Sequence, residues 1–232
     1  MRTIILTDCH VGSRESNYKD VKSVLPSIKF DELVLGGDFW DLWDMSPKRL
    51  LSRHADALAL LEQVRSMGVK ITYVLGNHDE AYRKAPIMRP DLADVIDGPY
   101  SLPGHGRRIM VIHGHEFDDL FQNHELYYRF LEWANRTAAI VGVSAKTFRR
   151  RTCTDYRGNA GFQNIIRRIH AAAARAYAGK CDCLIMGHTH FPIHELDVEP
   201  GLEFVNAGDW KWSNTWVDVN DGVVTLNEFR YV

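Results

Sequence analysis

The stretch Ile4-Ile5-Leu6-Thr7-Asp8-Cys9-His10 is a short apolar run that ends in a carboxylate and an imidazole. The apolar part predicts a buried strand, and the polar side chains fall where that strand would give way to a loop. Open α/β sheets bind their ligands in this position, beyond the carboxyl ends of the strands. Because Asp8 and His10 are two positions apart on an extended segment, both side chains can point to one side and bind one ion.

The same arrangement recurs at four more apolar runs, each of which is followed by Asp, Asn or His. The candidate metal ligands are Asp8, His10, Asp38, Asn77, His113, His188 and His190. Such a mixed nitrogen and oxygen set suits manganese, with iron or zinc as alternatives, better than it suits magnesium. We expect two divalent cations that share the Asp38 carboxylate. One cation would be held by Asp8, His10, Asp38 and His190, and the other by Asp38, Asn77, His113 and His188.

Two cations in one cleft indicate phosphoryl chemistry. At a separation of about 3.5–4 Å they can clamp a phosphate and lower the pKa of the water that attacks phosphorus. His78 directly follows a predicted ligand, but its own side chain is expected to stay off the metals. We predict that His78 protonates the leaving oxygen or stabilises the developing charge, and that Asp79 orients the His78 imidazole.

Strand and helix patterns alternate in the first half of the chain, which predicts an α/β fold with a sheet covered by helices. Helices are expected at Asn17–Ile28 and Leu50–Met67. Strands are expected at 4–6, 33–35, 69–75, 95–102, 109–112, 183–186, 202–206, 215–220 and 223–230. The Asp221-Gly222 pair predicts a hairpin turn between the last two strands.

Strand patterns are missing from residues 118–180, which we interpret as a helical cap inserted into a single domain of residues 1–232. Residues 120–180 hold eleven Lys and Arg against three Asp and Glu, although the whole chain has a net charge of −2. This basic segment suits an anionic phosphorylated substrate or an acidic membrane leaflet. A solvated helix face is the alternative. The candidate substrate contacts are His115, Arg149, Arg157 and Asn159.

Composition sets the broader expectations. The chain is 45% apolar and 25% charged, as in ordinary globular proteins. A signal peptide and an apolar run of about 18 residues are both missing, so we expect a cytoplasmic protein, with peripheral contact to the inner membrane as an option. Four cysteines without a disulfide framework fit a reducing compartment. No nucleic-acid partner is expected, because basic and aromatic residues do not interleave. The oligomeric state is left open.

The ordered motifs as a set resemble the calcineurin-like metallophosphoesterase superfamily. The motifs are Asp8-x-His10, Gly37-Asp38, Gly76-Asn77-His78-Asp79, His113 and Gly187-His188-Thr189-His190. The resemblance implies a four-layer αββα sandwich and a dinuclear metal centre. A narrower resemblance, to the UDP-2,3-diacylglucosamine pyrophosphatase family, lies in residues 37–43, 113–118, 190–192 and 206–210. It implies hydrolysis of a lipid A precursor at the inner membrane surface and a helical cap after the His113 motif.

Two positions differ from the narrower family pattern and keep other substrates in view. His78 and His115 stand where that family usually has Arg and Asp. A general phosphomonoesterase or phosphodiesterase with the same centre is therefore the alternative. Some proteins of this fold, such as a retromer subunit, are non-catalytic protein-binding scaffolds. The complete ligand set and His78 argue against that role here.

Overall fold

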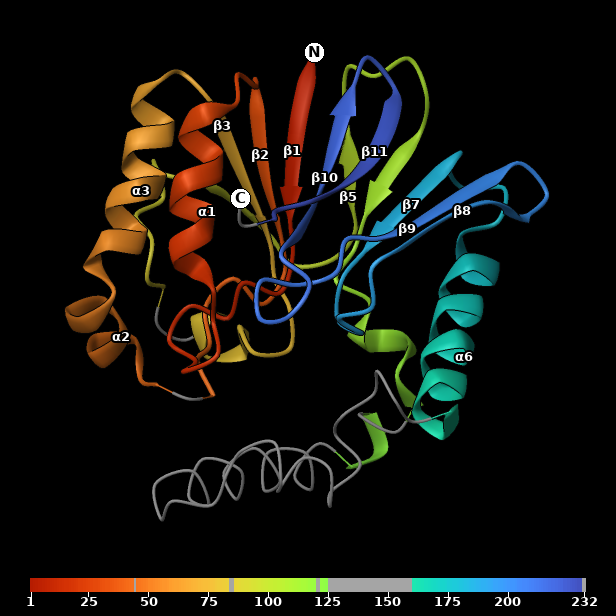
Figure 1. Cartoon of the computed structure of the whole chain (residues 1–232), viewed down its shortest axis with the longest axis horizontal. Helices are drawn as coiled ribbons and strands as arrows, with labels where there is room; N and C mark the ends of the chain where they lie inside the picture. Colours follow the sequence, from red (N-terminus) through yellow and green to blue (C-terminus); the bar gives the residue numbers. More distant parts are fainter. Residues whose placement is uncertain (44, 84–85, 120–121, 125–159, 231–232) are drawn as a thin grey trace.

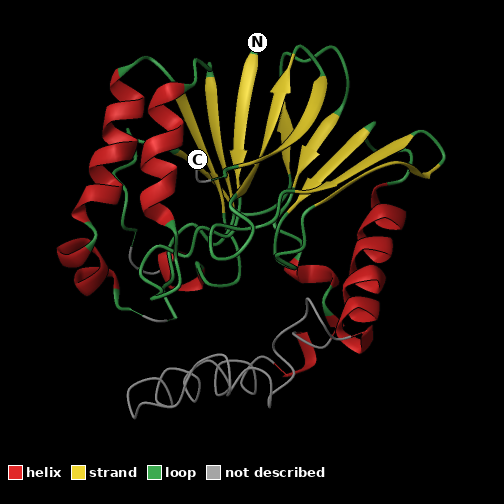
Figure 2. Cartoon of the chain, viewed as in Figure 1, coloured by secondary structure: helices red, strands yellow, loops and turns green. Residues whose placement is uncertain are grey.

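Two β-sheets lie face to face, and helices cover their outer faces (Figure 1, Figure 2). The computed structural model describes residues 1–43, 45–83, 86–119, 122–124 and 160–230. This arrangement confirms the expected four-layer αββα sandwich.

The first sheet has the strand order β11-β10-β1-β2-β3-β4 within the described ranges. Its strands are β1 Arg2–Leu6, β2 Glu32–Gly36, β3 Lys70–Val74, β4 Asp94–Ile96, β10 Thr215–Asn220 and β11 Val223–Glu228. Strands β1 to β4 are parallel, and the β10–β11 hairpin pairs antiparallel with β1. The carboxyl ends of β1, β2 and β3 therefore share one edge of the sheet.

The second sheet has the order β5-β6-β7-β9-β8, again for the described part of the chain. Its strands are β5 Tyr100–Leu102, β6 Ile109–Val111, β7 Cys183–Met186, β8 Ile193–Glu199 and β9 Leu202–Asn206. Strands β6, β7 and β9 are parallel, whereas β5 and β8 are antiparallel edge strands. The carboxyl ends of the parallel strands β6, β7 and β9 lie at the same edge of the sandwich as those of β1, β2 and β3.

Apolar side chains from alternate strand positions fill the spaces between successive layers. In β1, Ile4 and Leu6 pack toward the helices, and Ile5 packs between the sheets. In β7, Ile185 packs between the sheets and Leu184 packs toward the outer helix. Because both faces of these strands are buried, they appear in the sequence as continuous apolar runs.

Helices α1 Tyr18–Val24 and α3 Ala55–Ser66 cover the first sheet, with α2 Pro47–Arg53 beside α3. Short 3₁₀ turns are η1 Leu25–Ser27, η2 Glu80–Arg83 and η3 His115–Phe117. Helix α6 Ala160–Tyr177 covers the second sheet, where Ile169 and Ala173 pack on β7 and β9 residues. The expected cap at 118–180 thus ends in a helix that forms the outer layer of the sandwich. Most of the rest of that segment lies outside the described residues.

Three elements differ from the sequence prediction. The helix expected at 50–67 is divided at His54, whose φ of −126° and ψ of 35° are not helical. The strand expected at 95–102 is two strands, because the chain leaves the first sheet after β4 and enters the second at β5. Strand β8 was not predicted, since it is an edge strand with mostly exposed side chains and no apolar run.

The helices of the described part are all too short or too polar to cross a membrane.

Candidate metal centre

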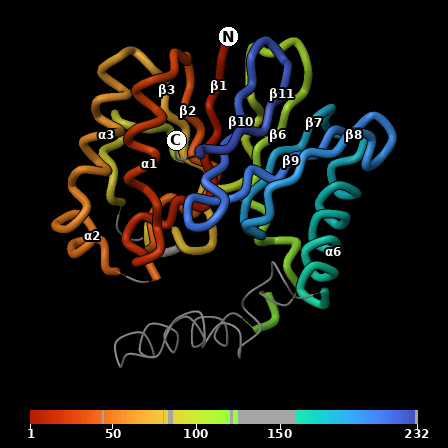
Figure 3. Tube along the Cα trace, viewed as in Figure 1, coloured from red at the N-terminus to blue at the C-terminus, as the bar shows by residue number. Residues whose placement is uncertain are grey.

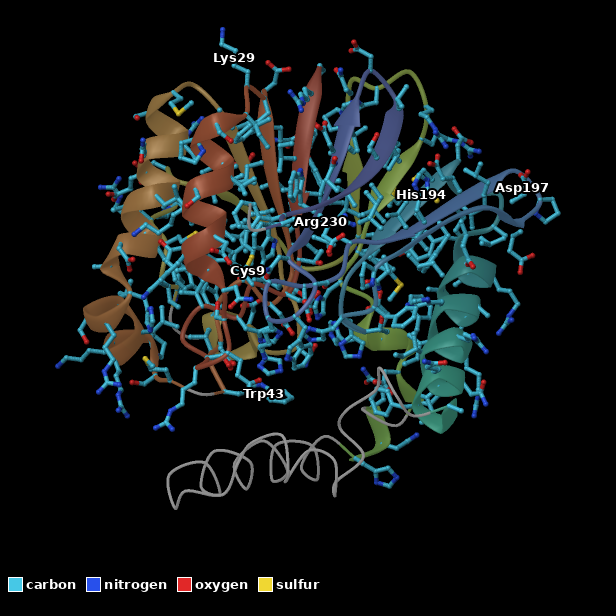
Figure 4. All side chains as sticks on the ribbon, viewed as in Figure 1. Cys9, Lys29, Trp43, His194, Asp197 and Arg230 are labelled. Carbon is cyan, nitrogen blue, oxygen red and sulfur yellow. The ribbon has the colours of Figure 1, made fainter. Side chains whose placement is uncertain are left out.

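The predicted ligands lie on the loops that follow β1, β2, β3, β6 and β7, all at the edge where the two sheets present their carboxyl ends. Figure 3 shows the loops after β1 and β9 side by side, and the Trp210 amide donates to the Asp8 carbonyl across them at 3.2 Å. Trp43, labelled in Figure 4, lies at the same edge. Residues 180 positions apart therefore meet in one site, as the Asp8 carboxylate and the His188 amide do.

Several ligand positions have a backbone conformation that side chains other than glycine rarely adopt. The residues with positive φ in the site are Asp8 at 52°, His10 at 45°, Asp38 at 52°, His188 at 65° and His190 at 55°. Each such residue costs on the order of 1–3 kcal/mol and persists only where its surroundings fix it. Hydrogen bonds between neighbouring loops fix these residues, for example His10 N to Asp38 O at 2.8 Å.

A first group of ligand atoms converges around Asp8. His190 Nε2 lies 3.5 Å and His10 Nε2 3.7 Å from Asp8 Oδ1, and His10 Nε2 lies 3.8 Å from Asp38 Oδ2. Asp8 Oδ1 and both His10 ring nitrogens are buried without a hydrogen-bond partner among the described residues. A buried polar atom left unpaired costs about 1–3 kcal/mol. A cation bound by Asp8 Oδ1 and His10 Nε2 would remove that cost, so these residues fit a metal.

A second group forms around His113. Its Nε2 lies 3.3 Å from Asp38 Oδ2 and 2.9 Å from Asn77 Oδ1. The His188 ring lies 5.4 Å from the His113 ring, and His188 Nε2 lies 3.1 Å from Asp118 Oδ2. Ligating histidines commonly place one ring nitrogen against a carboxylate, so a metal bond of His188 would use Nδ1. Asp38 contacts both groups, as a bridging carboxylate must.

The electrostatics of the site couple buried carboxylates to buried imidazoles. Burial alone would raise the pKa of Asp38, but the neighbouring His113 and His78 more than offset this and hold the pKa well below its usual range. Burial lowers the pKa of His113, but Asp38 dominates and raises it to about 10. The carboxylates therefore carry negative charge that a divalent cation could neutralise in place of protons.

A further carboxylate, that of Asp209, orients His190. Asp209 Oδ2 lies 2.9 Å from His190 Nδ1, and Asp209 Oδ1 accepts hydrogen bonds from the Trp212 and Ser213 amides. The His190 Nε2 is thereby directed toward Asp8. Sequence reasoning missed the role of Asp209. The residue falls inside the quoted 206–210 motif, but spacing alone does not show which carboxylate reaches a histidine behind the ligand shell.

His78 is fixed by an acidic partner and an aromatic partner. Its Nδ1 lies 3.0 Å from Asp41 Oδ1, and the Trp43 ring stacks on it with centroids 3.9 Å apart. Asp41 also lies 3.6 Å from His10, so one carboxylate serves two histidines. Burial lowers the pKa of His78, but Asp38 and Asp41 raise it to about 9. The raised pKa favours a protonated His78 imidazole beside the predicted ligands near pH 7.

The prediction that Asp79 orients His78 is wrong. Asp79 Oδ2 instead accepts hydrogen bonds from the Asp38 amide at 2.7 Å and the Gly76 amide at 3.0 Å. The loop after β3 turns the Asp79 side chain back toward the loop after β2. Asp79 therefore fixes the backbone that carries Asp38, while Asp41 contacts the His78 imidazole.

Of the four predicted substrate contacts, only His115 lies within the described residues. The half-buried His115 lies at the rim of the second group, with its ring 5.4 Å from that of His113 and 6.3 Å from that of His188. Arg149, Arg157 and Asn159 lie outside the described residues, and their contact with substrate stays a prediction.

The chain is similar to known phosphoesterases both in sequence and in fold. The calcineurin-like phosphoesterase family model matches residues 1–192. A UDP-2,3-diacylglucosamine hydrolase from Ralstonia nicotianae is 27% identical over 216 residues, which are 83% of this chain and 78% of the relative. A novel archaeal phosphodiesterase has a TM-score of 0.53 at 14% identity and covers 99% of this chain and 100% of its own. A single mutant of Vps29 from Entamoeba histolytica has a TM-score of 0.50, with the same identity and the same coverages. These two structures support the fold alone.

Proposed function

The chain belongs to the calcineurin-like phosphoesterase family, and we propose that it is a dimetal hydrolase of phosphoester or diphosphate bonds. The observation that carries this proposal is the convergence of Asp8 Oδ1, His10 Nε2 and His190 Nε2 on one buried point, where the first two atoms have no hydrogen-bond partner among the described residues. A site built only for stability would pair such atoms.

Two cations would be held by the seven predicted ligands, with Asp38 shared between them. Bound manganese, or alternatively iron or zinc, would clamp the phosphate and lower the pKa of the attacking water. Asp209 orients His190 for this task, and Asp41 lies 3.6 Å from His10 Nδ1. The ligand set combines imidazole, carboxylate and amide oxygen, which suits these metals better than magnesium.

His78 supplies the proton for the leaving oxygen. Asp41 holds its Nδ1, so the proton to be transferred resides on Nε2, which lies 4.0 Å from Asp38 Oδ2. The stacked Trp43 fixes the plane of the imidazole. A positioned general acid of this kind contributes about a hundred- to ten-thousand-fold in rate.

For the substrate, we propose a diphosphate-linked nucleotide sugar with lipid chains, like that of UDP-2,3-diacylglucosamine hydrolase. The similarity to the Ralstonia enzyme and the basic segment 120–180 support this assignment. Arg149, Arg157 and Asn159 would contact the anionic substrate, and the same segment would provide peripheral contact with the inner membrane. A phosphomonoester or phosphodiester is the second candidate, because His78 and His115 depart from the lipid hydrolase pattern.

Parallel assays of the manganese-loaded protein separate these candidates. UDP-2,3-diacylglucosamine, p-nitrophenyl phosphate and bis-p-nitrophenyl phosphate are offered to wild type and to Asp38→Asn. We expect turnover of the lipid diphosphate to exceed that of both aryl esters and to disappear in Asp38→Asn. Faster turnover of an aryl ester would favour the second candidate. Equal, background rates in wild type and Asp38→Asn would indicate a protein-binding scaffold.

Replacing Arg149, Arg150 and Arg151 together by Ala tests the basic segment. Loss of lipid-substrate turnover with retained aryl ester turnover is expected. Equal loss on both substrates would contradict a substrate-binding role.

A further inference from the structure

Thr189 lies between the two ligands of the loop after β7. His188 and His190 on either side of it have φ values of 65° and 55°, so the loop adopts a conformation that its own residues do not favour. Something outside the loop must hold it in this shape. The side chain of Thr189 is buried, so it points away from solvent and into the fold.

The Thr189 hydroxyl joins the loop to two other elements. Asn206, at the end of β9, donates from Nδ2 to Thr189 Oγ1 at 3.1 Å and to the Gly187 carbonyl at 2.7 Å. His170 Nε2, on α6, lies 2.8 Å from Thr189 Oγ1. Oγ1 accepts from Asn206, and a hydroxyl that donates its own hydrogen to His170 Nε2 completes the network. Asn206 Nδ2 also lies 3.5 Å from His170 Nε2.

His170 is suited to accept this hydrogen bond. It is 7% exposed, and its ring packs on Phe204 of β9 with centroids 5.0 Å apart. Burial, and secondarily His188, lowers the pKa of His170 to about 4, so its imidazole is neutral near pH 7. A neutral ring with its proton on Nδ1 leaves Nε2 as the acceptor that the Thr189 hydroxyl requires.

We propose that His170 is a positioning residue that holds the ligand pair His188 and His190 in place through the Thr189 hydroxyl. Helix α6 thereby sets the geometry of the metal-binding loop, although no α6 side chain belongs to the predicted ligand set. The inference rests on the proposed metal-dependent function. A buried histidine that only packs α6 onto β9 is the competing explanation.

A matched pair of substitutions at Thr189 isolates the hydroxyl. Thr189→Val keeps the shape of the side chain and removes the hydroxyl, whereas Thr189→Ser keeps the hydroxyl. Mn²⁺ is titrated calorimetrically into metal-stripped wild type, Thr189→Val, Thr189→Ser and His170→Ala. Loss of partners behind the ligands typically weakens metal affinity about 10- to 100-fold. We expect that loss in Thr189→Val and His170→Ala, and less than about a three-fold change in Thr189→Ser.

The double variant and a helix control complete the test. Because His170 acts through Thr189, the double variant Thr189→Val/His170→Ala should bind Mn²⁺ no more weakly than the weaker single variant. Ile166→Ala removes a buried contact of the same helix without touching the hydrogen bonds. It should lower the melting temperature of the metal-free protein but keep wild-type Mn²⁺ affinity.

The outcomes separate this inference from the proposed function. Wild-type affinity in Thr189→Val, or equal affinity losses in Ile166→Ala and His170→Ala, would overturn the positioning role alone. Wild-type protein that binds no Mn²⁺ would overturn both the positioning role and the proposed function.

Discussion

The imidazole of His78 is the group on which the proposed chemistry most depends at the scale of single residues. Asp41 accepts at one ring nitrogen, and Trp43 covers one ring face. These contacts keep the ring beside Asp38 without making it a ligand. Position in the sequence predicted that His78 is separate from the metals, but not which neighbours hold it.

His78→Ala should retain both metals and lose about two to four powers of ten in kcat on substrates with poor leaving groups. The loss should be smaller for p-nitrophenyl esters, because their leaving oxygen needs no proton. Steady-state rates on an alkyl and an aryl phosphate, with metal content measured alongside, check this. Equal losses on both esters would contradict general acid catalysis by His78.

His170 should make unfolding sensitive to mild acid. Its pKa is about 4 in the folded protein, and the usual value for an unfolded chain is about 6.5. Between these values only the unfolded chain gains the proton, so the free energy of unfolding falls as pH drops from about 6.5 to about 4. The free energy of unfolding changes by on the order of 3 kcal/mol across this range.

Denaturant unfolding of wild type and His170→Gln at several pH values measures this contribution. The stability difference between the two proteins should shrink as the pH falls through that window and stay constant above it. A difference that does not vary with pH would show that His170 has an ordinary pKa.

The position of each candidate ligand could be predicted from the sequence, because each follows an apolar run that becomes a buried strand. The carboxylates behind them could not. Asp41 and Asp79 both lie close to a ligand in the sequence, and only the direction in which each loop turns decides that Asp41 contacts His78 and Asp79 contacts backbone amides. That direction follows from hydrogen bonds between loops distant in sequence.

At the scale of elements, the loops pack so closely that certain glycines have no room for a side chain. A Cβ at Gly187 would overlap the Asp8 carboxylate and approach Thr7 Cβ to 2.7 Å. The loops after β1 and β7 can therefore bring their ligands together only if this position stays glycine.

Gly187→Ala should displace Asp8 or His188 and weaken Mn²⁺ binding at least about ten-fold, a loss typical of disturbed metal geometry. Gly201→Ala is the matched control, because its φ of 74° is strained for alanine but no atom lies within 4 Å of the added Cβ. The control should cost stability, on the order of 1 kcal/mol, and leave metal affinity unchanged. Calorimetric titration measures the Mn²⁺ affinity of both variants, and thermal melting measures their stability. Similar affinities in the two variants would contradict the steric argument.

Element boundaries were least predictable where the chain changes layers. Residues 95–102 form one strand-like pattern, but Gly98, with a φ of 137°, lies where the chain passes from β4 in one sheet to β5 in the other. A pattern of apolar residues does not encode which sheet a strand joins. Helix α6 shows the same limit, since the sequence predicted a helical segment at 118–180 but not that its last helix covers the second sheet.

At the scale of the whole molecule, the site joins loops from both sheets at one edge of the sandwich, and metal binding should stabilise the entire fold. Ligands from both sheets would be tied through shared cations. A ligand present at a hundred times its dissociation constant adds about 2.7 kcal/mol to the free energy of unfolding.

Removing metal with a chelator should therefore lower the melting temperature by several degrees, and added Mn²⁺ should restore it. Scanning calorimetry of wild type and Asp38→Asn, each with and without Mn²⁺, measures the effect. Asp38→Asn should show little response to Mn²⁺. An equal rise in both proteins would indicate metal binding elsewhere on the chain.

The position of β1 has a consequence for biosynthesis. Strand β1 is made first, yet one of its edges pairs with β10, which is made more than 200 residues later. On the ribosome, the nascent chain carries β1 with the backbone N–H and C=O groups of that edge unpaired for most of translation. Completion of the first sheet, and with it a stable loop for Asp8 and His10, is consequently a late event that waits for β10.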